Sequence, residues 1–559
     1  MAFKEGVIQG LIRKGEYYDS VSLMIISKKI REEKGVFDSS VVMCTEENKK
    51  NLRDANLFLE EFENAEESDL LVAIRASSAS LANELLKKLE KEIKILNKGG
   101  DDSDYDSGAD PSRAGRRSEN CDYKNFEGAY QKGLKEEANL ALISVNGKYA
   151  GDVALKALNK NMHVMLFSDN VSLETEIELK QLAQQKNLLV MGPDCGTAII
   201  AGVPLAFANE VSRGSIGVLG ASGTGMQEVT TLISNFGEGI SHAIGTGGRD
   251  VKKEVGGISF LMALKMLKED VQTKVILLVS KPPHKEVMDK IIKEIDKTKS
   301  VVAVFLGASD VCNSCDNNNN NIIFRDNLYE GALTAYKIAR GEGANIDDEM
   351  KKLNEESDKI AKLESEKIKK GAKYLRGLYS GGTFASEAQL ILDFNGDSNN
   401  DGDNDEELYS NVPTAKSKRL SDVKVSTKNT IIDLGEDEFT LGKPHPMIDY
   451  TLRNERFLKE INDPEVAVIM LDYVLGHGSH KDPLSDTISI LQKAFDILAK
   501  EKRYISILTT VTGTAKDPQN SEKVKEALRR EGVIVVDSNF QMSLIAKKVI
   551  TYGKKHIKG

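Results

Sequence analysis

The chain has 559 residues and a formal net charge of −10, from 76 Lys and Arg against 86 Asp and Glu. The length predicts several domains, each able to bury a core of its own. Without the basic patch or stripe that nucleic acids require, the acidic balance argues against a nucleic-acid partner. No apolar run approaches the ~20 residues of a membrane-spanning helix.

Cysteine usage and the first residues indicate a reducing compartment. The five cysteines are too few and too scattered for a disulfide framework. Residues 1–18 lack the apolar stretch of a signal peptide, so we expect a cytoplasmic enzyme. Cys312 and Cys315 form a lone C-x-x-C beside an asparagine tract, without the second half of a zinc site, so no metal site is predicted.

Residues 1–97 predict a small N-terminal α/β domain. Within it, residues 20–30 favour a strand feeding a helix, residues 39–52 a strand, turn and helix, and residues 69–78 a further strand. Residues 98–124 are polar and almost free of large apolar groups, which predicts a disordered insert. We expect its deletion to leave melting temperature and turnover close to those of the full chain.

Residues 125–213 predict a Rossmann unit. Apolar strand-like runs at 138–147, 162–169 and 187–197 alternate with helical patterns at 149–160 and 172–186. This β-α-β-α-β alternation is typical of a parallel, doubly wound sheet.

A glycine-rich turn opens the next unit, residues 214–312. A short apolar run leads into Gly220, Ser222, Gly223, Thr224 and Gly225, and a helical pattern follows to a stop at Gly237. A turn of this kind before a helix directs free N–H groups at an anion, so we assign it to phosphate binding. A tight turn without a ligand would look the same, and the motif alone is a weak signal.

The same device recurs in residues 373–559, where Ser380, Gly381, Gly382 and Thr383 open a second apolar helix. In both copies a Gly-Thr pair is followed by a glutamate, Glu228 or Glu387, at one spacing. We therefore predict two flavodoxin-like domains with ligands at the carboxyl ends of their parallel strands. An insert and helical connector (313–372) joins them, and an acidic insert (395–411), also expected to be dispensable, interrupts the second.

Two polar segments in the last domain hold the candidate catalytic residues. Gly478–Pro483 is matched by Gly513–Pro518, where Ala515 stands in place of His480. Because the matched segment folds without a histidine, we assign His480 a chemical role. Asp482 is a candidate base. The alternative is that His480 is an exposed surface histidine. His445, with Pro on both sides in a segment that reads as a loop, is the second candidate.

These motifs together resemble the FdrA family, within the superfamily of the succinyl-CoA synthetase α-subunit. The resemblance lies in GASGTGMQEVT, LLVMGPDCGT, GLYSGGTFASEAQL, IIDLGEDEFTLGKPHPMID and VLGHGSHKDP, and covers nearly the whole chain except three inserts. The chain has Lys443 where the family usually has Arg, and Tyr450 where it usually has Pro.

The resemblance implies an α/β protein with a CoA-binding-like Rossmann unit, two succinyl-CoA synthetase-like domains and the small N-terminal domain. CoA is the one cofactor it suggests, with the segment Gly192, Pro193, Asp194 and Cys195 lining its site. Cys195 as a small buried hydrophobe is the alternative, because no base for a nucleophile is visible near it.

The synthetase carries a phosphohistidine soon after its last strand, but this chain has no histidine between His284 and His445. We also see no ATP-grasp domain, so we expect no phosphoenzyme and a substrate that is already activated. The resemblance implies the large subunit of oxamate carbamoyltransferase in allantoin degradation, with carbamoyl phosphate, oxamate and other enzyme subunits as partners. The glycine loops with Arg249 or Lys443 would hold phosphate, and His480 or His445 would stabilise the oxyanion.

Two alternatives come from other classes of protein. One is a succinyl-CoA synthetase-like acyl-CoA ligase subunit that acts on a carboxylate or acyl-CoA, with its phosphohistidine relocated or supplied by a partner. The other is a non-catalytic scaffold that binds CoA or phosphate.

Overall fold

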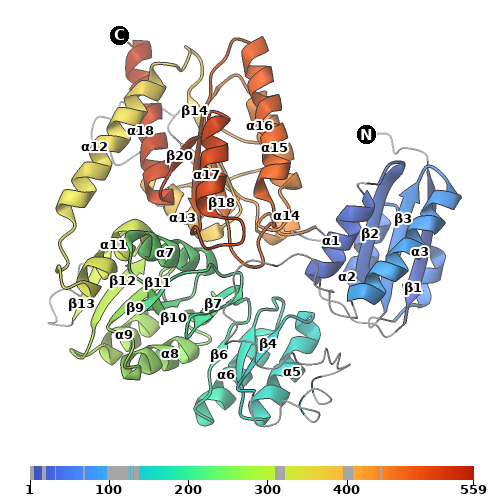
Figure 1. Cartoon of the computed structure of the whole chain (residues 1–559), viewed down its shortest axis with the longest axis horizontal. Coiled ribbons are helices and arrows are strands. Elements are labelled where there is room, and N and C mark those ends of the chain that lie inside the picture. The colour runs from blue at the N-terminus through green and yellow to red at the C-terminus, as the bar shows by residue number, and fades with distance from the viewer. Residues whose placement is uncertain are drawn as a thin grey trace, which may run out of the picture. The chain divides into compact units, whose positions relative to one another are not determined.

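The computed structural model describes residues 6–14, 20–31, 33–66, 69–96, 126, 130, 138–308, 321–394, 407–440 and 443–558 (Figure 1). The insert predicted at 98–124, Cys312, Cys315 and most of the acidic insert lie outside these residues. The chain divides into two compact units, residues 1–162 with 442–444 and residues 163–441 with 445–559, and each is described by itself.

The N-terminal unit holds a three-stranded antiparallel sheet in the order β1-β3-β2, coloured blue in Figure 1. Its elements are β1 (Val7–Arg13), α1 (Ser20–Arg31), β2 (Val36–Met43), α2 (Glu46–Asp54), η1 (Glu60–Asn64), β3 (Leu70–Ala76) and α3 (Ala79–Leu96). β3 is buried along its whole length between its two neighbours. The small α/β domain is confirmed.

The strand predicted within residues 20–30 is wrong. Ser20–Arg31 is one helix, whose buried residues Leu23, Ile26 and Ile30 recur at helical spacing. The short apolar run Leu-Met-Ile-Ile imitated a buried strand, which periodicity alone cannot distinguish from a helix segment.

The predicted Rossmann alternation is confirmed in its order. β4 (Leu140–Ile143) and α5 (Gly147–Asn159) belong to the first unit. β5 (His163–Leu166), α6 (Leu173–Gln185) and β6 (Val190–Met191) belong to the second, where β5 and β6 pair in parallel. Ser172 caps α6 by accepting from the Thr175 N–H at 3.2 Å.

A seven-stranded sheet follows in the order β13-β12-β11-β9-β10-β7-β8. Its strands are β7 (Thr197–Ile200), β8 (Val203–Ala206), β9 (Arg213–Gly220), β10 (Ile240–Gly245), β11 (Val275–Ser280), β12 (Ser300–Phe305) and β13 (Ile322–Arg325). They run parallel except for the β7–β8 hairpin, which adds to one edge from residues predicted for the Rossmann unit. Its helices are α7 (Gly223–Phe236), α8 (Ile258–Glu269), α9 (Lys285–Glu294), α11 (Leu328–Ala339) and α12 (Asp347–Ser365).

A second seven-stranded sheet, parallel throughout, has the order β16-β15-β17-β14-β18-β19-β20. Its strands are β14 (Tyr374–Tyr379), β15 (Leu408–Ser410), β16 (Lys418–Arg419), β17 (Asn429–Asp433), β18 (Val466–Val474), β19 (Ser506–Thr512) and β20 (Ile534–Val536). Its helices are α13 (Gly382–Ile391), α14 (Asp437–Thr440), α15 (Thr451–Ile461), α16 (Pro483–Lys500), α17 (Ser521–Arg530) and α18 (Asn539–Lys558). The polar segment predicted as a loop therefore begins with a buried strand, β17.

One apolar core joins the two sheets of the second unit. Met226 of α7, Phe384 of α13 and Met542 of α18 belong to the same buried cluster and are each fully buried. Since α7 and α13 are the helices that follow the two glycine turns, this shared core fixes the turns relative to each other.

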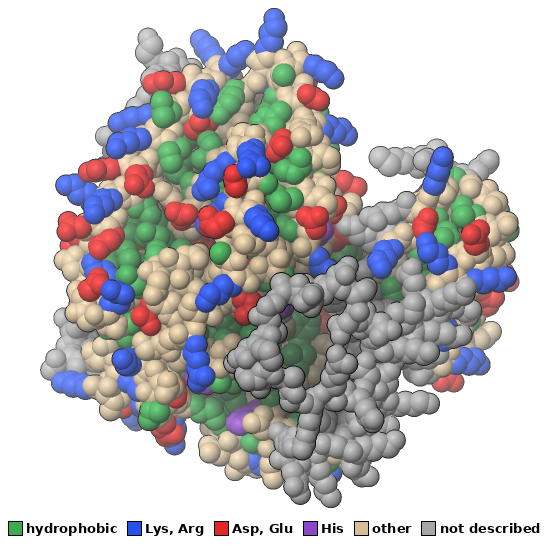
Figure 2. Space-filling view, viewed as in Figure 1, with side chains coloured by type: hydrophobic (Ala, Val, Ile, Leu, Met, Phe, Trp, Pro, Cys, Tyr) green, Lys and Arg blue, Asp and Glu red, His purple; other side chains and the backbone are tan. Residues whose placement is uncertain are grey.

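The surface carries both charges. On the face shown in Figure 2, Lys and Arg side chains are intermixed with Asp and Glu side chains. Among the described helices, none is long and apolar enough to span a membrane. The described residues also contain no group of three His, Cys, Asp or Glu side chains that could hold a metal ion.

Candidate functional site

The two glycine turns meet at the N-termini of α7 and α13. Ser222 caps α7, with its Oγ accepting from the Gly225 N–H at 3.2 Å, and the same Oγ lies 2.5 Å from Thr383 Oγ1 on α13. A methyl group added to Gly381 would lie 2.9 Å from Thr224 Cγ2, so the backbone at Gly381 also approaches the Thr224 side chain closely. The repeated motif of the sequence thus forms one site from two strand ends.

The first turn has room for a ligand at Gly223. A methyl group added there would meet only Thr197 Oγ1, at 3.5 Å, which is an ordinary contact. Gly220 and Gly225 are closed, since added methyl groups would lie 2.6 Å from Met226 Cγ and from Ser222 Oγ. The first N–H groups of α7 have no partner within the helix and carry the positive end of its dipole. Anion binding at Gly223 stays a prediction, and the space at this position is compatible with it.

The second turn is already occupied by an internal carboxylate. Asp472, fully buried on β18, accepts from the Ser380 N–H at 2.8 Å and from the Gly381 N–H at 2.9 Å. Burial raises the pKa of this carboxyl, and the nearby Arg453 guanidinium lowers it. The Asp472 carboxylate thus takes the N–H groups of Ser380 and Gly381 that were expected to face a phosphate. The phosphate-binding roles of Ser380, Gly381, Gly382 and Thr383 stay predictions.

His445 lies beside this junction. A methyl group added to Gly435 would stand 2.7 Å from His445 Nε2, 3.0 Å from Ser380 O and 3.2 Å from Asp433 Oδ1. The imidazole ring also lies 6.4 Å from the ring of Phe207, which in turn lies 5.5 Å from Phe167, both measured between centroids. The second unit thus brings His445 to the glycine turns, with an aromatic pair at its side.

The hydrogen bonds of His445 define its chemistry. Burial lowers the pKa of the imidazole to about 4, so it is neutral near pH 7. Its Nδ1 accepts from the Met447 N–H at 3.2 Å, which places the proton of the neutral ring on Nε2. His445 is therefore a hydrogen-bond donor at Nε2 rather than a nucleophile.

His480 and Asp482 serve the start of α16. The ring of His480 stacks on Tyr450 at 4.9 Å, its Nε2 lies 3.1 Å from Asp486 Oδ2, and its Nδ1 accepts from the Asp482 N–H. Asp482 is the N-cap of α16 and accepts from the Leu484 and Ser485 N–H groups. These contacts are enough to give both side chains a structural role at the start of α16. The catalytic roles of His480 and Asp482 stay predictions.

The two predicted phosphate-binding cations differ in their surroundings. Arg249 forms an ion pair with the buried Glu176, with Nε 2.8 Å from Oε2, and donates to Val171 O. It is thus held by Glu176 of α6 and by Val171, which precedes the N-cap residue of that helix. Lys443 is exposed and belongs to the first unit, and its role stays a prediction.

The segment predicted to line CoA forms a turn after β6 in which Gly192, Pro193 and Cys195 are buried. Gly192 has a φ of 103°, and an added methyl group would lie 2.2 Å from Leu166 O, so only glycine fits. Pro193 follows it. Cys195 is buried against Thr197 O and Gly245 O, and burial raises the pKa of its thiol to about 12. The thiol is therefore unreactive, in agreement with the buried-hydrophobe alternative. Asp194 is exposed in the same turn.

Three charged residues of this region were not predicted as site residues from the sequence: Asp433, Asp472 and Lys281. Lys281 directly follows β11, and its charge lowers the pKa of Asp433. The signal that could have found all three is their position at or near the carboxyl ends of strands, where ligands of parallel sheets bind.

The recurring glutamates connect the two glycine-turn helices to other helix starts. Glu228 accepts from the Asn539 N–H at 3.0 Å and from Thr512 Oγ1 at 2.5 Å. Glu387 accepts from the Leu328 N–H at 2.8 Å and from Asn539 Nδ2 at 2.7 Å. Both glutamates are fully buried, and their hydrogen bonds hold the N-termini of α11 and α18.

We expect Glu387 to make stability fall as pH rises. Burial raises the pKa of Glu387 from 4.5 to about 7, so the folded chain holds a proton that the unfolded chain releases in this window. The free energy of unfolding should then fall by up to about 1.4 kcal/mol per pH unit between pH 4.5 and 7. Glu387→Gln should flatten this dependence, measured by urea unfolding. The exposed Glu355→Gln is the control, and an unchanged slope in Glu387→Gln would contradict the assignment.

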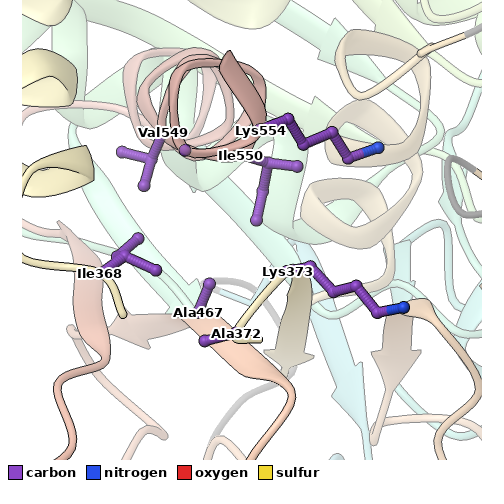
Figure 3. Close-up of a pocket in the computed structure, with 8 residues that line it drawn as sticks. Ile368, Ala372, Lys373, Ala467, Val549, Ile550 and Lys554 are labelled. Atoms are coloured by element: carbon purple, nitrogen blue, oxygen red, sulfur yellow. The ribbon is translucent and has the colours of Figure 1, made fainter. Parts of the chain in front are cut away.

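A small pocket lies at the opposite end of the second sheet, between α18 and the starts of β14 and β18 (Figure 3). It holds about 10 Å³, which is roughly the room for one water molecule. Its wall is formed by Ile368, Ala372, Lys373, Ala467, Val549, Ile550, Gly553 and Lys554. The pocket is too small for a substrate, so the carboxyl ends of the strands remain the candidate site.

Comparison with known families defines the class of this fold. A family model described as CoA-ligase matches residues 378–549, and one described as a CoA binding domain matches residues 211–307. The domain with the second glycine turn is thus similar to CoA-ligase domains, and the domain with the first turn is similar to CoA-binding domains. A model described as AllF, heavy metal-associated domain, matches residues 7–109.

The chain belongs to the same family as the uncharacterized protein YahF of Escherichia coli. The two are 39% identical over 549 residues, which cover 98% of this chain and 99% of YahF. A more distant relative is the α-subunit of ADP-forming succinate–CoA ligase of Aquifex aeolicus, which is 27% identical over 34% of this chain and 64% of that subunit. Another is the subunit SqwL of the ADP-forming sulfoacetate–CoA ligase of Acholeplasma sp., which is 29% identical over 30% of this chain and 57% of SqwL. A solved structure of ATP citrate lyase from Methanothrix soehngenii is 13% identical over 78% of this chain and 81% of that one, with a TM-score of 0.35.

These relatives correct the predicted enzyme class. The superfamily and the fold class are confirmed, since the matched domains and the named subunits are those of CoA ligases. The prediction of a carbamoyltransferase is wrong, because the matches are to acid–thiol ligases and not to carbamoyl-transferring enzymes.

Proposed function

We propose that this chain is a subunit of an acid–thiol ligase and carries the half-reaction between an acyl phosphate and CoA. The carbonyl carbon of the acyl phosphate exchanges its bond to a phosphate oxygen for a bond to the CoA sulfur. The products are an acyl-CoA thioester and phosphate. Nucleotide chemistry, for which we identified no domain in the sequence, is then the task of a partner subunit.

The observation that carries this proposal is the meeting of the two helix N-termini at Ser222 and Thr383. At the first turn, Gly223 leaves space in front of N–H groups that favour an anion. A phosphate held there would sit next to His445 and Asp433, and its acyl group would face the Phe167–Phe207 pair.

His445 suits the role of an electrophile in this reaction. Its neutral ring has the Nε2 proton available for the acyl carbonyl oxygen, where negative charge develops as the thiolate attacks. The same tautomer leaves no lone pair on Nε2 for a phosphoryl group, which supports our expectation that no phosphoenzyme forms.

Thioester formation tests the proposal. Purified protein should convert acetyl phosphate and CoA into acetyl-CoA and phosphate without ATP, and should bind CoA in a calorimetric titration. Incubation with labelled ATP should leave the chain unlabelled. Absence of both thioester formation and CoA binding would contradict the proposal, and acid-labile label on His445 would contradict the assigned tautomer. The AllF description of the N-terminal match supports, as a further proposal, a role in allantoin metabolism.

A further inference from the structure

The side chain of Asp433 lies where the second glycine turn meets α13, and it takes no part in the pairing of the strands. It is the last residue of β17 and 3% exposed. Its Oδ1 accepts from the Gly435 N–H at 2.9 Å, and Oδ2 lies against α13, where a methyl group added to Gly382 would stand 2.5 Å away. A methyl group added to Gly435 would lie 3.2 Å from Asp433 Oδ1 and 2.7 Å from His445 Nε2, so both groups border the same position. The carboxyl therefore lies against the N-terminus of α13 and in the neighbourhood of His445.

Charged groups of both signs surround Asp433. Glu436 and Asp472 raise the pKa of its carboxyl, while Lys281 and the Gly435 N–H lower it. The neutral His445 adds no charge near pH 7. Burial is the largest effect and brings the pKa to about 7, so the carboxyl exchanges its proton in the physiological range.

We propose that Asp433 is the proton carrier of this site, taking the thiol proton of CoA and passing it to the departing phosphate. The inference rests on the proposed function. The carboxylate of Asp433 removes the S–H proton, the sulfur lone pair attacks the acyl carbonyl carbon, and the bond from that carbon to the phosphate oxygen breaks. The carboxyl then donates the proton to the phosphate, and Asp433 returns to its starting form.

The position of Asp433 fits both steps. A base is most effective when its pKa lies near the working pH, and a thiol with an ordinary pKa of ~8.5 needs only modest help. A buried carboxyl at the mouth of an anion site can also donate once it is protonated. In contrast, Asp472 is committed to two N–H groups and an arginine and has no such freedom.

The test is Asp433→Asn, which preserves the shape and the bond from Gly435. Asp422→Asn is the matched control, because Asp422 accepts from the N–H two residues ahead in the same way, at 2.8 Å, but is exposed. We expect Asp433→Asn to lower kcat about 10²-fold or more with acetyl phosphate and CoA. The dissociation constant of CoA and the melting temperature should stay close to wild type, and Asp422→Asn should be unchanged in all three.

Two readouts separate the outcomes. In the wild type kcat/KM should fall as pH drops below about 7, since the base must be deprotonated, and Asp433→Asn should lose this limb. Ultraviolet absorbance of the thiolate should appear when CoA binds to the wild type and be absent in Asp433→Asn. Normal kcat and an unchanged pH limb in the variant would overturn the role of Asp433 alone. A wild type that binds CoA without making thioester would overturn the proposed function, and the thiolate signal would still decide whether Asp433 takes the proton.

Discussion

Lys180→Met should reduce the free energy of unfolding of the second unit by about 3–5 kcal/mol. Lys180 is fully buried, and its Nζ donates to Glu176 Oε1 at 2.8 Å, to Asp250 Oδ1 at 2.8 Å and to Thr246 O at 3.1 Å. Methionine fills the space but leaves two carboxylates buried without their ammonium. Because Asp250 also accepts from the first N–H groups of α8, the loss spreads to that helix.

The measurement is urea unfolding of the full chain. Lys265→Met is the control, since Lys265 pairs with Glu269 at 4.0 Å with both side chains about two-thirds exposed. A surface pair of this kind contributes ~0–1 kcal/mol. Equal losses in the two variants would mean that the buried cluster does not hold α6 onto the first seven-stranded sheet.

Gly223→Val should abolish phosphate binding at the first glycine turn and lower kcat/KM for acetyl phosphate by about 10²-fold or more. The added side chain enters the space in front of the α7 N-terminus, where its Cβ would lie 3.5 Å from Thr197 Oγ1, an ordinary contact. The fold should therefore persist. At Gly225, in contrast, any side chain would collide with Ser222 Oγ and disturb the helix start.

Phosphate titration and steady-state kinetics measure this effect, with the melting temperature as a check on folding. Gly553→Val on α18 is the control, because an added methyl group there would meet nothing within 4 Å. Unchanged kinetics in a folded Gly223→Val protein would contradict an anion site at the first glycine turn.

The sequence predicted most of the fold because buried parallel strands read as continuous apolar runs. Val275–Ser280 and Val466–Val474 are buried at every position, and helical patterns separate them from their neighbours. The failure at Ser20–Arg31 has the opposite cause, since four adjacent apolar residues fit a strand as well as a helix.

The candidate site was only partly predictable. A glycine-rich turn is visible in the composition of the sequence, and this pattern identifies Ser222 and Gly223 as candidates. The partner that fills the second turn was not, because Ser380 and Asp472 are 92 positions apart and only the sheet order β14-β18 brings them together. Asp433 was not singled out, because it ends a buried strand and both of its neighbours in sequence are apolar.

Phosphate release with and without CoA distinguishes a CoA-ligase half-reaction from carbamoyl transfer. Purified protein is given acetyl phosphate with CoA, and in parallel carbamoyl phosphate with oxamate in a CoA-free mixture. A CoA-ligase half-reaction predicts phosphate release only in the first mixture, matched by an equal amount of acetyl-CoA. Phosphate release in the second mixture, together with no thioester in the first, would contradict it.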